Sequence, residues 1–313
     1  MDHIPLPDIP SQKLRISMHL GAHKTATTHL QHSLEANADL LAQSKVIFRG
    51  PLDLRGPKKS LQSRFGLLTN TPPKSKELAE QELWALAGGA NRLVLSEENF
   101  LGPMWRIKKG RRVPPLYPNS DSQLEKLIPY FGGRPLSLFL AVRNPADLIA
   151  SAYSQSLVGG KAEPFKDFSE GMTFHDVRWS NVVRRLSLVP EVAEIYVWRY
   201  EDYPANFVRI MRKLVGWKLG QHVEPIARRV HSGMSQRAVE QVLQQASPTD
   251  SRAQQREMAI AARSLFPTAP ENPRYSPWSQ NEIEVAASAY RSDFEDVSKM
   301  EKVKVIGAWQ PRK

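Results

Sequence analysis

Cysteine is absent from the 313 residues of the chain. The protein therefore has no disulfide, no thiolate metal ligand and no cysteine nucleophile, and it is suited to a reducing compartment. No apolar run approaches the roughly 18–20 residues that a membrane-spanning helix needs. The first residues, MDHIPLPDIPSQK, lack the basic and apolar regions of a signal peptide. We therefore predict a soluble, cytoplasmic protein with no transmembrane segment.

Acidic residues are also scarce, since 43 lysines and arginines face 32 carboxylates and give a net charge of +11. Such a surplus predicts anionic partners without identifying them. Aromatic residues do not alternate with the basic ones, and no helix-turn-helix, zinc-finger or RRM sequence is present, which argues against nucleic acid. The basic residues gather in two loop-like segments, around 55–64 and 106–112, which are either solvated surface, a site for an anionic acceptor or part of a nucleotide site.

Four short apolar runs, at 14–20, 93–95, 136–142 and 195–198, have the length and composition of buried strands. Helical patterns occupy the segments between and after them, at 28–43, 76–87, 122–131, 146–157, 174–188 and 206–215. Strands that alternate with helices predict a mostly parallel sheet, here in a three-layer α/β/α arrangement. Ligands of such sheets bind beyond the carboxyl ends of the strands.

The last third of the chain has a different pattern, because strand signals fade after about residue 220. Helices are expected at 235–245, 253–265 and 281–297, with a proline-rich connection around 267–277. We predict an α/β core over residues 1–220 and a helical extension over residues 221–313 that packs on this core. No internal repeat or low-complexity tract is evident.

Residues 14–34, LRISMHLGAHKTATTHLQHSL, combine an alternating strand pattern, a tight turn and the start of an amphipathic helix. A helix N-terminus presents unpaired N–H groups and the positive end of a dipole, which together bind phosphate. A lysine adds a point charge, and three threonines add hydroxyl donors. We predict an anion-binding loop formed by Gly21, Ala22, His23, Lys24, Thr25, Ala26, Thr27 and Thr28.

A nucleoside triphosphatase loop of the Walker A type is the rival interpretation. That motif requires G-x-x-x-x-G-K-[ST]. Lys24 instead follows Gly21 by three residues, and no glycine directly precedes it. The candidate strands end in Ser-Glu-Glu or in arginine, so no convincing Walker B aspartate follows either. A nucleotide-dependent kinase remains the alternative.

Two other strand ends carry unusual residues. The run at 93–95 is followed by Ser-Glu-Glu-Asn-Phe, which places Glu97 and Glu98 just beyond a buried strand. The run at 136–142 delivers Arg143 to the sheet edge, and Ser151 follows eight residues later on the next helix. Two helical turns separate them by about 9–12 Å along the axis. They can meet on one phosphate only if the arginine reaches back toward the helix.

Taken together these segments resemble the sulfotransferases that use 3′-phosphoadenosine 5′-phosphosulfate. GAHKTATTHLQ is similar to the family's 5′-phosphosulfate loop, which typically reads HKTGTT in bacterial members, and AVRNPADLIASAYSQSL resembles its 3′-phosphate motif. SEENF is similar to a Ser-x-Glu-Asn segment of the family, and VWRYED to its R-Y-E-D stretch. The resemblance spans about residues 14–203 in the family's order, and it implies a P-loop NTPase-like fold.

The resemblance also implies roles for individual residues. Lys24 would contact the bridging oxygen between phosphate and sulfate, the loop from Thr25 to Thr28 would hold the 5′-phosphate, and Arg143 with Ser151 would hold the 3′-phosphate. The product would be 3′,5′-ADP, and no metal is expected, since His23, His29 and His32 do not form a ligand set. The acceptor, a hydroxyl or amine of a carbohydrate or other metabolite, small or polymeric and possibly anionic, is not identified by the sequence.

The sequence leaves two questions: which residue acts as the general base, and how Ala26 affects the loop. Glu98 is the expected base, because it matches the family's glutamate and shares a strand face with Ser96. Glu97 and a histidine are the alternatives. Ala26 stands where the family usually has glycine, which is harmless at negative φ and restricts the approach of a ligand at positive φ. A relative that binds a nucleotide or glycan without catalysis is a further alternative, but Lys24 together with Glu98 favours an enzyme.

Overall fold

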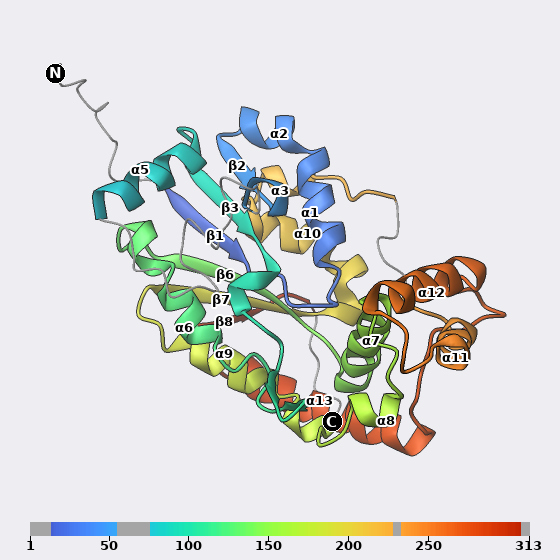
Figure 1. Cartoon of the computed structure of the whole chain (residues 1–313). Coiled ribbons are helices and arrows are strands. Elements are labelled where there is room, and N and C mark those ends of the chain that lie inside the picture. Colours follow the sequence, from blue (N-terminus) through green and yellow to red (C-terminus); the bar gives the residue numbers. More distant parts are fainter. Residues whose placement is uncertain (1–13, 55–75, 228–232, 308–313) are drawn as a thin grey trace.

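The computed structural model describes residues 14–54, 76–227 and 233–307. Its centre is a parallel sheet of six strands in the order β2-β3-β1-β6-β7-β8 (Figure 1). The strands are β1 (Arg15–His19), β2 (Val46–Arg49), β3 (Arg92–Ser96), β6 (Leu136–Val142), β7 (Val192–Arg199) and β8 (Val303–Val305). The predicted parallel sheet is confirmed.

Helices cover both faces of this sheet and complete the three layers (Figure 1). One face packs against α1 (Thr27–Ala36), α2 (Ala38–Gln43) and α10 (Tyr203–Leu214). The other face packs against α5 (Lys76–Ala87), α6 (Ser120–Glu125), α7 (Pro145–Val158), α9 (Trp179–Ser187) and α13 (Gln280–Ser298). The fold is therefore the expected α/β/α arrangement.

The strand β6 is apolar at nearly every position because side chains on both of its faces are buried. Leu138 and Leu140 contribute to the hydrophobic cluster on one face of the sheet, whereas Phe139 and Ala141 contribute to the cluster on the other. All four side chains are fully buried. Because helices cover both faces, neither face of a central strand tolerates the polar residues that alternate in a half-exposed strand.

Several expected elements differ in their boundaries. The helix expected over 28–43 is divided into α1 and α2 at Asn37, whose side-chain amide donates to the carbonyls of Ser33 and Glu224. The segment 122–131 forms α6 followed by the 3₁₀ turn η2 (Ile128–Phe131), and 174–188 forms η3 (Phe174–Asp176) followed by α9. The short elements α3 (Pro51–Leu54), α8 (Phe165–Phe168), η1 (Glu98–Leu101), η4 (Tyr200–Asp202) and η5 (Leu219–Gln221) connect the larger ones.

One of the two basic segments is not a loop. Residues 106–112 form a small antiparallel hairpin of β4 (Arg106–Lys108) and β5 (Arg111–Val113). Arg111 pairs with Glu170 at 2.8 Å and Arg112 with Glu163 at 2.9 Å, so two of its charges are engaged within the protein. The other segment, with Arg55, Lys58, Lys59 and Arg64, lies outside the described residues.

The part of the chain after residue 220 is mostly helical, as expected. It comprises α11 (Gln236–Gln245), α12 (Arg252–Leu265) and α13, and it packs on α7 and α9 of the core (Figure 1). It also contains β8, which pairs with β7 at the edge of the central sheet, so the extension is not entirely helical. The boundary near residue 220 stays a prediction. In the described part of the chain, no helix combines the length and apolar character needed to cross a membrane.

Candidate functional site

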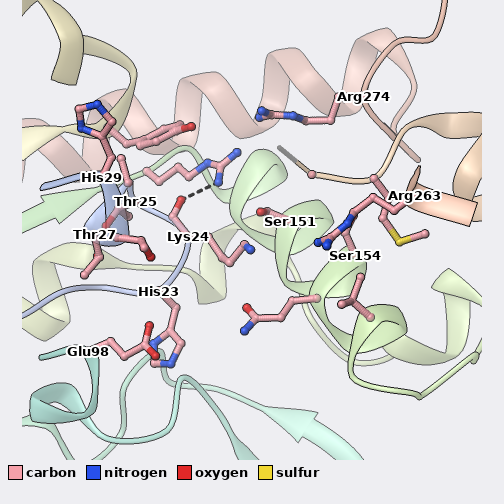
Figure 2. A pocket seen from close by; sticks show the side chains of 18 of the residues that line it. His23, Lys24, Thr25, Thr27, His29, Glu98, Ser151, Ser154, Arg263 and Arg274 are labelled. Atoms are coloured by element: carbon pink, nitrogen blue, oxygen red, sulfur yellow. Dashed lines mark hydrogen bonds between the residues drawn. The ribbon is translucent and has the colours of Figure 1, made fainter. Parts of the chain in front are cut away.

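A cavity of about 460 Å³ opens where β1 and β6 end (Figure 2). The loop between β1 and α1 forms one wall, and Glu98, Arg143 and Ser151 also line the cavity. Of the residues predicted from the sequence, the structure brings together His23, Lys24, Thr25, Ala26, Thr27, Thr28, Glu98, Arg143 and Ser151. Gly21 and Ala22, the first two residues of the loop, are buried and do not line the cavity.

The loop turns through backbone conformations that L-residues rarely adopt. Gly21, Lys24 and Ala26 have φ angles of 58°, 65° and 62°. A Cβ atom on Gly21 would lie 3.0 Å from the backbone nitrogen of Glu98, so glycine is needed there for space as well as for φ. Ala26 directly precedes α1 and occupies the left-handed region. Ala26, which stands where the loops that this segment resembles usually have glycine, therefore has a strained backbone conformation.

This strain predicts that Ala26→Gly raises the free energy of unfolding by about 1 kcal/mol, because glycine adopts the left-handed region without steric penalty. The matched control is Ala261→Gly, an exposed position inside α12. There the same substitution lowers stability by about 0.5–1 kcal/mol. Denaturant titration of both variants measures the difference. A loss of stability in Ala26→Gly would contradict the conformation of the loop.

Threonine hydroxyls hold the loop in this conformation. Thr25 Oγ1 donates to the carbonyl oxygen of Ala22 at 2.6 Å, and Thr27 Oγ1 donates to the same oxygen at 3.1 Å. Both threonines are nearly fully buried, whereas Thr28 is only half-buried on the first turn of α1. The first N–H groups of a helix have no partner within it, so the cavity faces a set of backbone donors.

Tyr117 anchors the loop, and the sequence motifs did not identify it. Its hydroxyl accepts a hydrogen bond from the backbone N–H of His23 at 2.8 Å and lies 3.0 Å from His23 Nδ1. Burial raises the pKa of Tyr117 well above its usual value, so the hydroxyl keeps its proton. The two contacts from one hydroxyl fix both the backbone and the ring of His23.

Lys24 is the cationic group of the loop. The pKa of its amine is lowered to about 8, first by burial and then by the positive charge of Arg143, while the negative charge of Glu98 acts in the opposite direction. The Lys24 side chain points into the cavity, while its backbone carbonyl is turned toward Arg143 (Figure 2). A lysine with this pKa is charged below pH 8 and becomes neutral within the next unit or two.

Arg143 extends from the end of β6 under the loop. It is only 3% exposed, and its Nη1 donates to the carbonyl oxygen of Lys24 at 2.6 Å. Its guanidinium lies over the ring of Tyr200, with Cζ 4.4 Å from the centroid. Among the described residues its Nε has no hydrogen-bond partner, and burial lowers the pKa of Arg143. A buried cation with an unused donor is the kind of group that binds an anion.

Ser151 reaches the same cavity from α7. Asn144 caps that helix by accepting the N–H of Ala146 at 2.9 Å, and Pro145 occupies its first turn. The Trp179 indole donates to the Arg143 carbonyl at 2.9 Å and fixes the turn between strand and helix. Arg143 and Ser151 therefore line the same cavity, and their meeting on one phosphate stays a prediction.

The two glutamates after β3 have different surroundings. The strand ends at Ser96, so the expected shared face of Ser96 and Glu98 does not extend to Glu98, which instead begins η1. Glu98 nevertheless lines the cavity. Glu97 is fully buried, and its Oε1 accepts from the N–H and the side-chain amide of Asn99, both at 3.0 Å. Of the two carboxylates, Glu98 is the one that a ligand in the cavity can reach.

His29, which lines the cavity, and His32 are the two other histidines that were not expected to form a metal ligand set. His29 Nδ1 lies 2.9 Å from the Tyr203 hydroxyl and its Nε2 lies 3.0 Å from the carbonyl oxygen of Ile226. His32 is exposed on α1. Within residues 14–54, 76–227 and 233–307, no three histidine, aspartate or glutamate side chains are grouped so that they could hold a metal ion.

The opposite wall of the cavity comes from the C-terminal part and was not predicted from the sequence. Its residues are Gly233, Met234, Arg256, Ile260, Arg263 and Arg274. Three of them lie on α12 at positions i, i+4 and i+7, which is the spacing of one helix face. That spacing is visible in the sequence, but nothing in it indicates which surface the face would meet.

The fold and site thus define an α/β protein with a cavity, lined by several cationic side chains, at the carboxyl ends of parallel strands. Comparison of the chain with protein-family models, with curated proteins and with solved structures found no match.

Proposed function

We propose that the protein is a sulfotransferase that moves a sulfuryl group from 3′-phosphoadenosine 5′-phosphosulfate to a hydroxyl or amine acceptor. One observation carries the proposal. A single cavity joins a phosphate-type loop at a helix N-terminus, with Lys24, to a second cationic position at Arg143 and Ser151. A nucleotide with anionic groups at both its 5′ and 3′ positions matches that arrangement.

The residues present fit such a donor. Arg143 is buried with Nε unpartnered among the described residues, and Lys24 is a half-buried amine with a lowered pKa. Both groups lose hydration on folding and regain a favourable partner when an anion enters the cavity. The first turn of α1 adds N–H donors and the positive end of the helix dipole.

The donor supplies an activated sulfuryl group, and the protein supplies position and charge. Lys24 neutralises the oxygen that leaves with the 5′-phosphate as its bond to sulfur breaks. Glu98 takes the proton of the acceptor hydroxyl or amine as the new bond to sulfur forms. His23, held by Tyr117, keeps the loop in register beside them. The products are 3′,5′-ADP and the sulfated acceptor.

Thermal-shift titration separates this function from that of a nucleotide-dependent kinase. At about 100 times Kd a ligand stabilises the folded protein by about 2.7 kcal/mol. We expect 3′,5′-ADP to reach this stabilisation at a far lower concentration than ATP with Mg²⁺. The 5′-diphosphate isomer of ADP is a control of equal composition. Equal or reversed effects of 3′,5′-ADP and ATP–Mg²⁺ would favour the kinase.

Transfer itself is tested with a labelled donor and a set of acceptors. Carbohydrates, both neutral and acidic, and small hydroxyl or amine metabolites are the first classes to screen. Label that moves to an acceptor in the presence of the protein identifies both the activity and the acceptor class. Tight 3′,5′-ADP binding without transfer to any class would favour a non-catalytic relative.

The pKa of Lys24 predicts how the affinity for 3′,5′-ADP depends on pH. In the free protein the amine loses its proton around pH 8, whereas a bound anion holds the proton on. Binding above pH 8 therefore takes up a proton, and affinity falls by up to about tenfold per pH unit. Lys24→Arg, which stays charged, is expected to remove this dependence. Calorimetric titrations of both proteins at pH 7, 8 and 9 measure this pH dependence. A wild-type affinity that is the same at pH 9 as at pH 7 would contradict the prediction.

A further inference from the structure

Three polar side chains are buried where helix α1 packs on the ends of β1 and β3. His19 is the last residue of β1, Ser96 is the last residue of β3, and the two are paired in the parallel sheet. Ser96 Oγ lies 2.8 Å from His19 Nδ1 and accepts a hydrogen bond from Gln31 Nε2 of α1 at 3.0 Å. All three are at most 5% exposed, and none lines the cavity. We call these three residues the Ser96 cluster.

The Ser96 cluster does not contribute charge to the site. Burial lowers the pKa of His19 to about 3, so its ring is neutral at physiological pH. The ring stacks on the indole of Trp198, with their centroids 5.9 Å apart. Gln31 Nε2 also lies 3.4 Å from the carbonyl oxygen of Ser96. The cluster is therefore a neutral, hydrogen-bonded unit, and what it contributes is geometry.

Apolar side chains could fill the same space. The surrounding cluster on this face of the sheet is otherwise formed by residues such as Leu30, Leu34 and Val94. Replacing both partners of a buried hydrogen bond with apolar groups of the same shape can be neutral or stabilising. A satisfied polar network, however, specifies one arrangement of the elements that it joins. The Ser96 cluster therefore fixes α1, β1 and β3 relative to one another.

The cluster is coupled to Glu98 through a short and well-held segment. Only Glu97 separates Ser96 from Glu98, and the Glu97 N–H donates to the His19 carbonyl oxygen at 3.2 Å. The Glu97 carboxylate caps η1, which begins at Glu98. A Cβ atom on Gly21 would lie 3.0 Å from the Glu98 backbone nitrogen, so this segment also packs against the start of the loop. A displacement of Ser96 would therefore also displace Glu98.

The cluster is coupled to the phosphate end of α1 as well. Gln31 follows Thr27, the first residue of the helix, by four positions, so both lie on one helix face. Thr27 Oγ1 donates to the Ala22 carbonyl oxygen in the loop, and Thr27 and Glu98 both line the cavity (Figure 2). Gln31 thus joins the helix that would hold the 5′-phosphate to the strand that leads to Glu98.

We propose that Gln31 and Ser96 are positioning residues, which hold Glu98 at a fixed place relative to the phosphate end of α1. This inference rests on the proposed function. Sulfuryl transfer is expected to need the acceptor atom, the sulfur and the leaving oxygen roughly in line, so the base and the donor loop must keep one geometry. A misplacement of about 1 Å can lower a rate about a hundredfold. Neither residue lines the cavity, so both act through Glu98.

Double-mutant cycles with Glu98 test the inference. Gln31→Met keeps the length of the side chain and removes its amide, and Ser96→Ala removes the hydroxyl. Transfer is measured with the labelled donor and whichever carbohydrate, hydroxyl or amine metabolite accepts label from the wild type. Each single variant is expected to lower kcat about tenfold or more and to change the Kd for 3′,5′-ADP by less than about twofold. In the Glu98→Gln background neither is expected to lower kcat further, because the base that they position is gone.

Ser17→Ala is the matched control. Ser17 is a fully buried serine of β1, it lies on the same strand face as His19, and its Oγ accepts from Arg92 Nη1 at 3.0 Å. It does not line the cavity, so its loss is expected to leave kcat unchanged. Melting transitions show whether each variant folds. If Ser96→Ala does not, Gln31→Met, which keeps the side-chain volume, takes its place.

The other outcomes can be told apart. An equal loss of kcat with and without the Glu98 carboxylate would show a general structural role and overturn the inference. Unchanged rates in Gln31→Met and Ser96→Ala would overturn it too. A loss of 3′,5′-ADP affinity as large as the loss of rate would assign the cluster to the donor site instead. A wild type that transfers label to no acceptor would refute the proposed function itself, and wild-type rates in Glu98→Gln would refute Glu98 as the base.

Discussion

Replacing Lys24 with alanine is expected to lower sulfuryl transfer by about 10²–10³-fold, the loss typical for removal of one donor to a developing charge. In the proposed mechanism, Lys24 neutralises the charge that develops on the leaving oxygen. The backbone of the loop is expected to remain folded, because its hydrogen bonds use the threonine hydroxyls and the Lys24 carbonyl and not the amine. Initial rates with the labelled donor measure the effect.

Lys45 provides a matched control for this variant. It is an exposed lysine that, like Lys24, has a positive φ, 54° against 65°, but it does not line the cavity. Lys45→Ala therefore removes the same charge from the same kind of backbone conformation, and we expect its rate to equal that of the wild type. Equal rates for the wild type and Lys24→Ala would refute the mechanism.

Arg143→Ala is expected to weaken 3′,5′-ADP by about a hundredfold and 5′-AMP far less. The substitution removes the buried cation that we propose binds the 3′-phosphate, and the loss of such a partner is usually worth several kcal/mol. The nucleotide comparison matters because Arg143 also supports the loop through the Lys24 carbonyl. A purely structural role would weaken both nucleotides alike.

Arg134 gives the corresponding control. Its Nη1 donates to the Phe131 carbonyl at 3.1 Å, and its guanidinium lies over the ring of Trp84, with Cζ 5.3 Å from the centroid. It thus has the same two kinds of contact as Arg143, but it does not line the cavity. Arg134→Ala is expected to leave both nucleotide affinities unchanged. A ratio of 3′,5′-ADP to 5′-AMP affinity that is the same in Arg143→Ala and the wild type would contradict the assignment of the 3′-phosphate to Arg143.

The central strands of the fold were predictable because they are buried on both faces. The apolar run 136–142 coincides with β6, since helices on both sides exclude polar residues from it. The edge strands were not predictable. β8 contains only Val303, Lys304 and Val305, and β2 ends in a phenylalanine and an arginine, so neither gives a long apolar run. Their strand conformation depends on pairing with neighbours far away in the sequence.

Half of the candidate cavity could be derived from local sequence, because Lys24, Glu98 and Arg143 each follow a recognisable strand. The rest could not. Tyr117 approaches His23 from 94 residues away, and Arg263 and Arg274 reach the cavity because α12 packs on α7. Such approaches are set by the packing of whole elements, which no local pattern encodes. The left-handed conformation of Ala26 could not be predicted either, because alanine ordinarily adopts negative φ.

The placement of β8 links the edge of the sheet to the cavity. β8 is the last strand of the described residues, and it extends the sheet beyond β7 through hydrogen bonds from Ile195 N–H to the Lys302 carbonyl and from Ile306 N–H to the Val197 carbonyl, both 2.8 Å. Without β8, strand β7 would be an open edge that can pair with another chain. The arginines of α12 belong to the same C-terminal part of the chain as β8. One segment therefore both covers the edge of β7 and supplies a wall of the cavity, so a change that detaches it is expected to expose the sheet edge and open the cavity together.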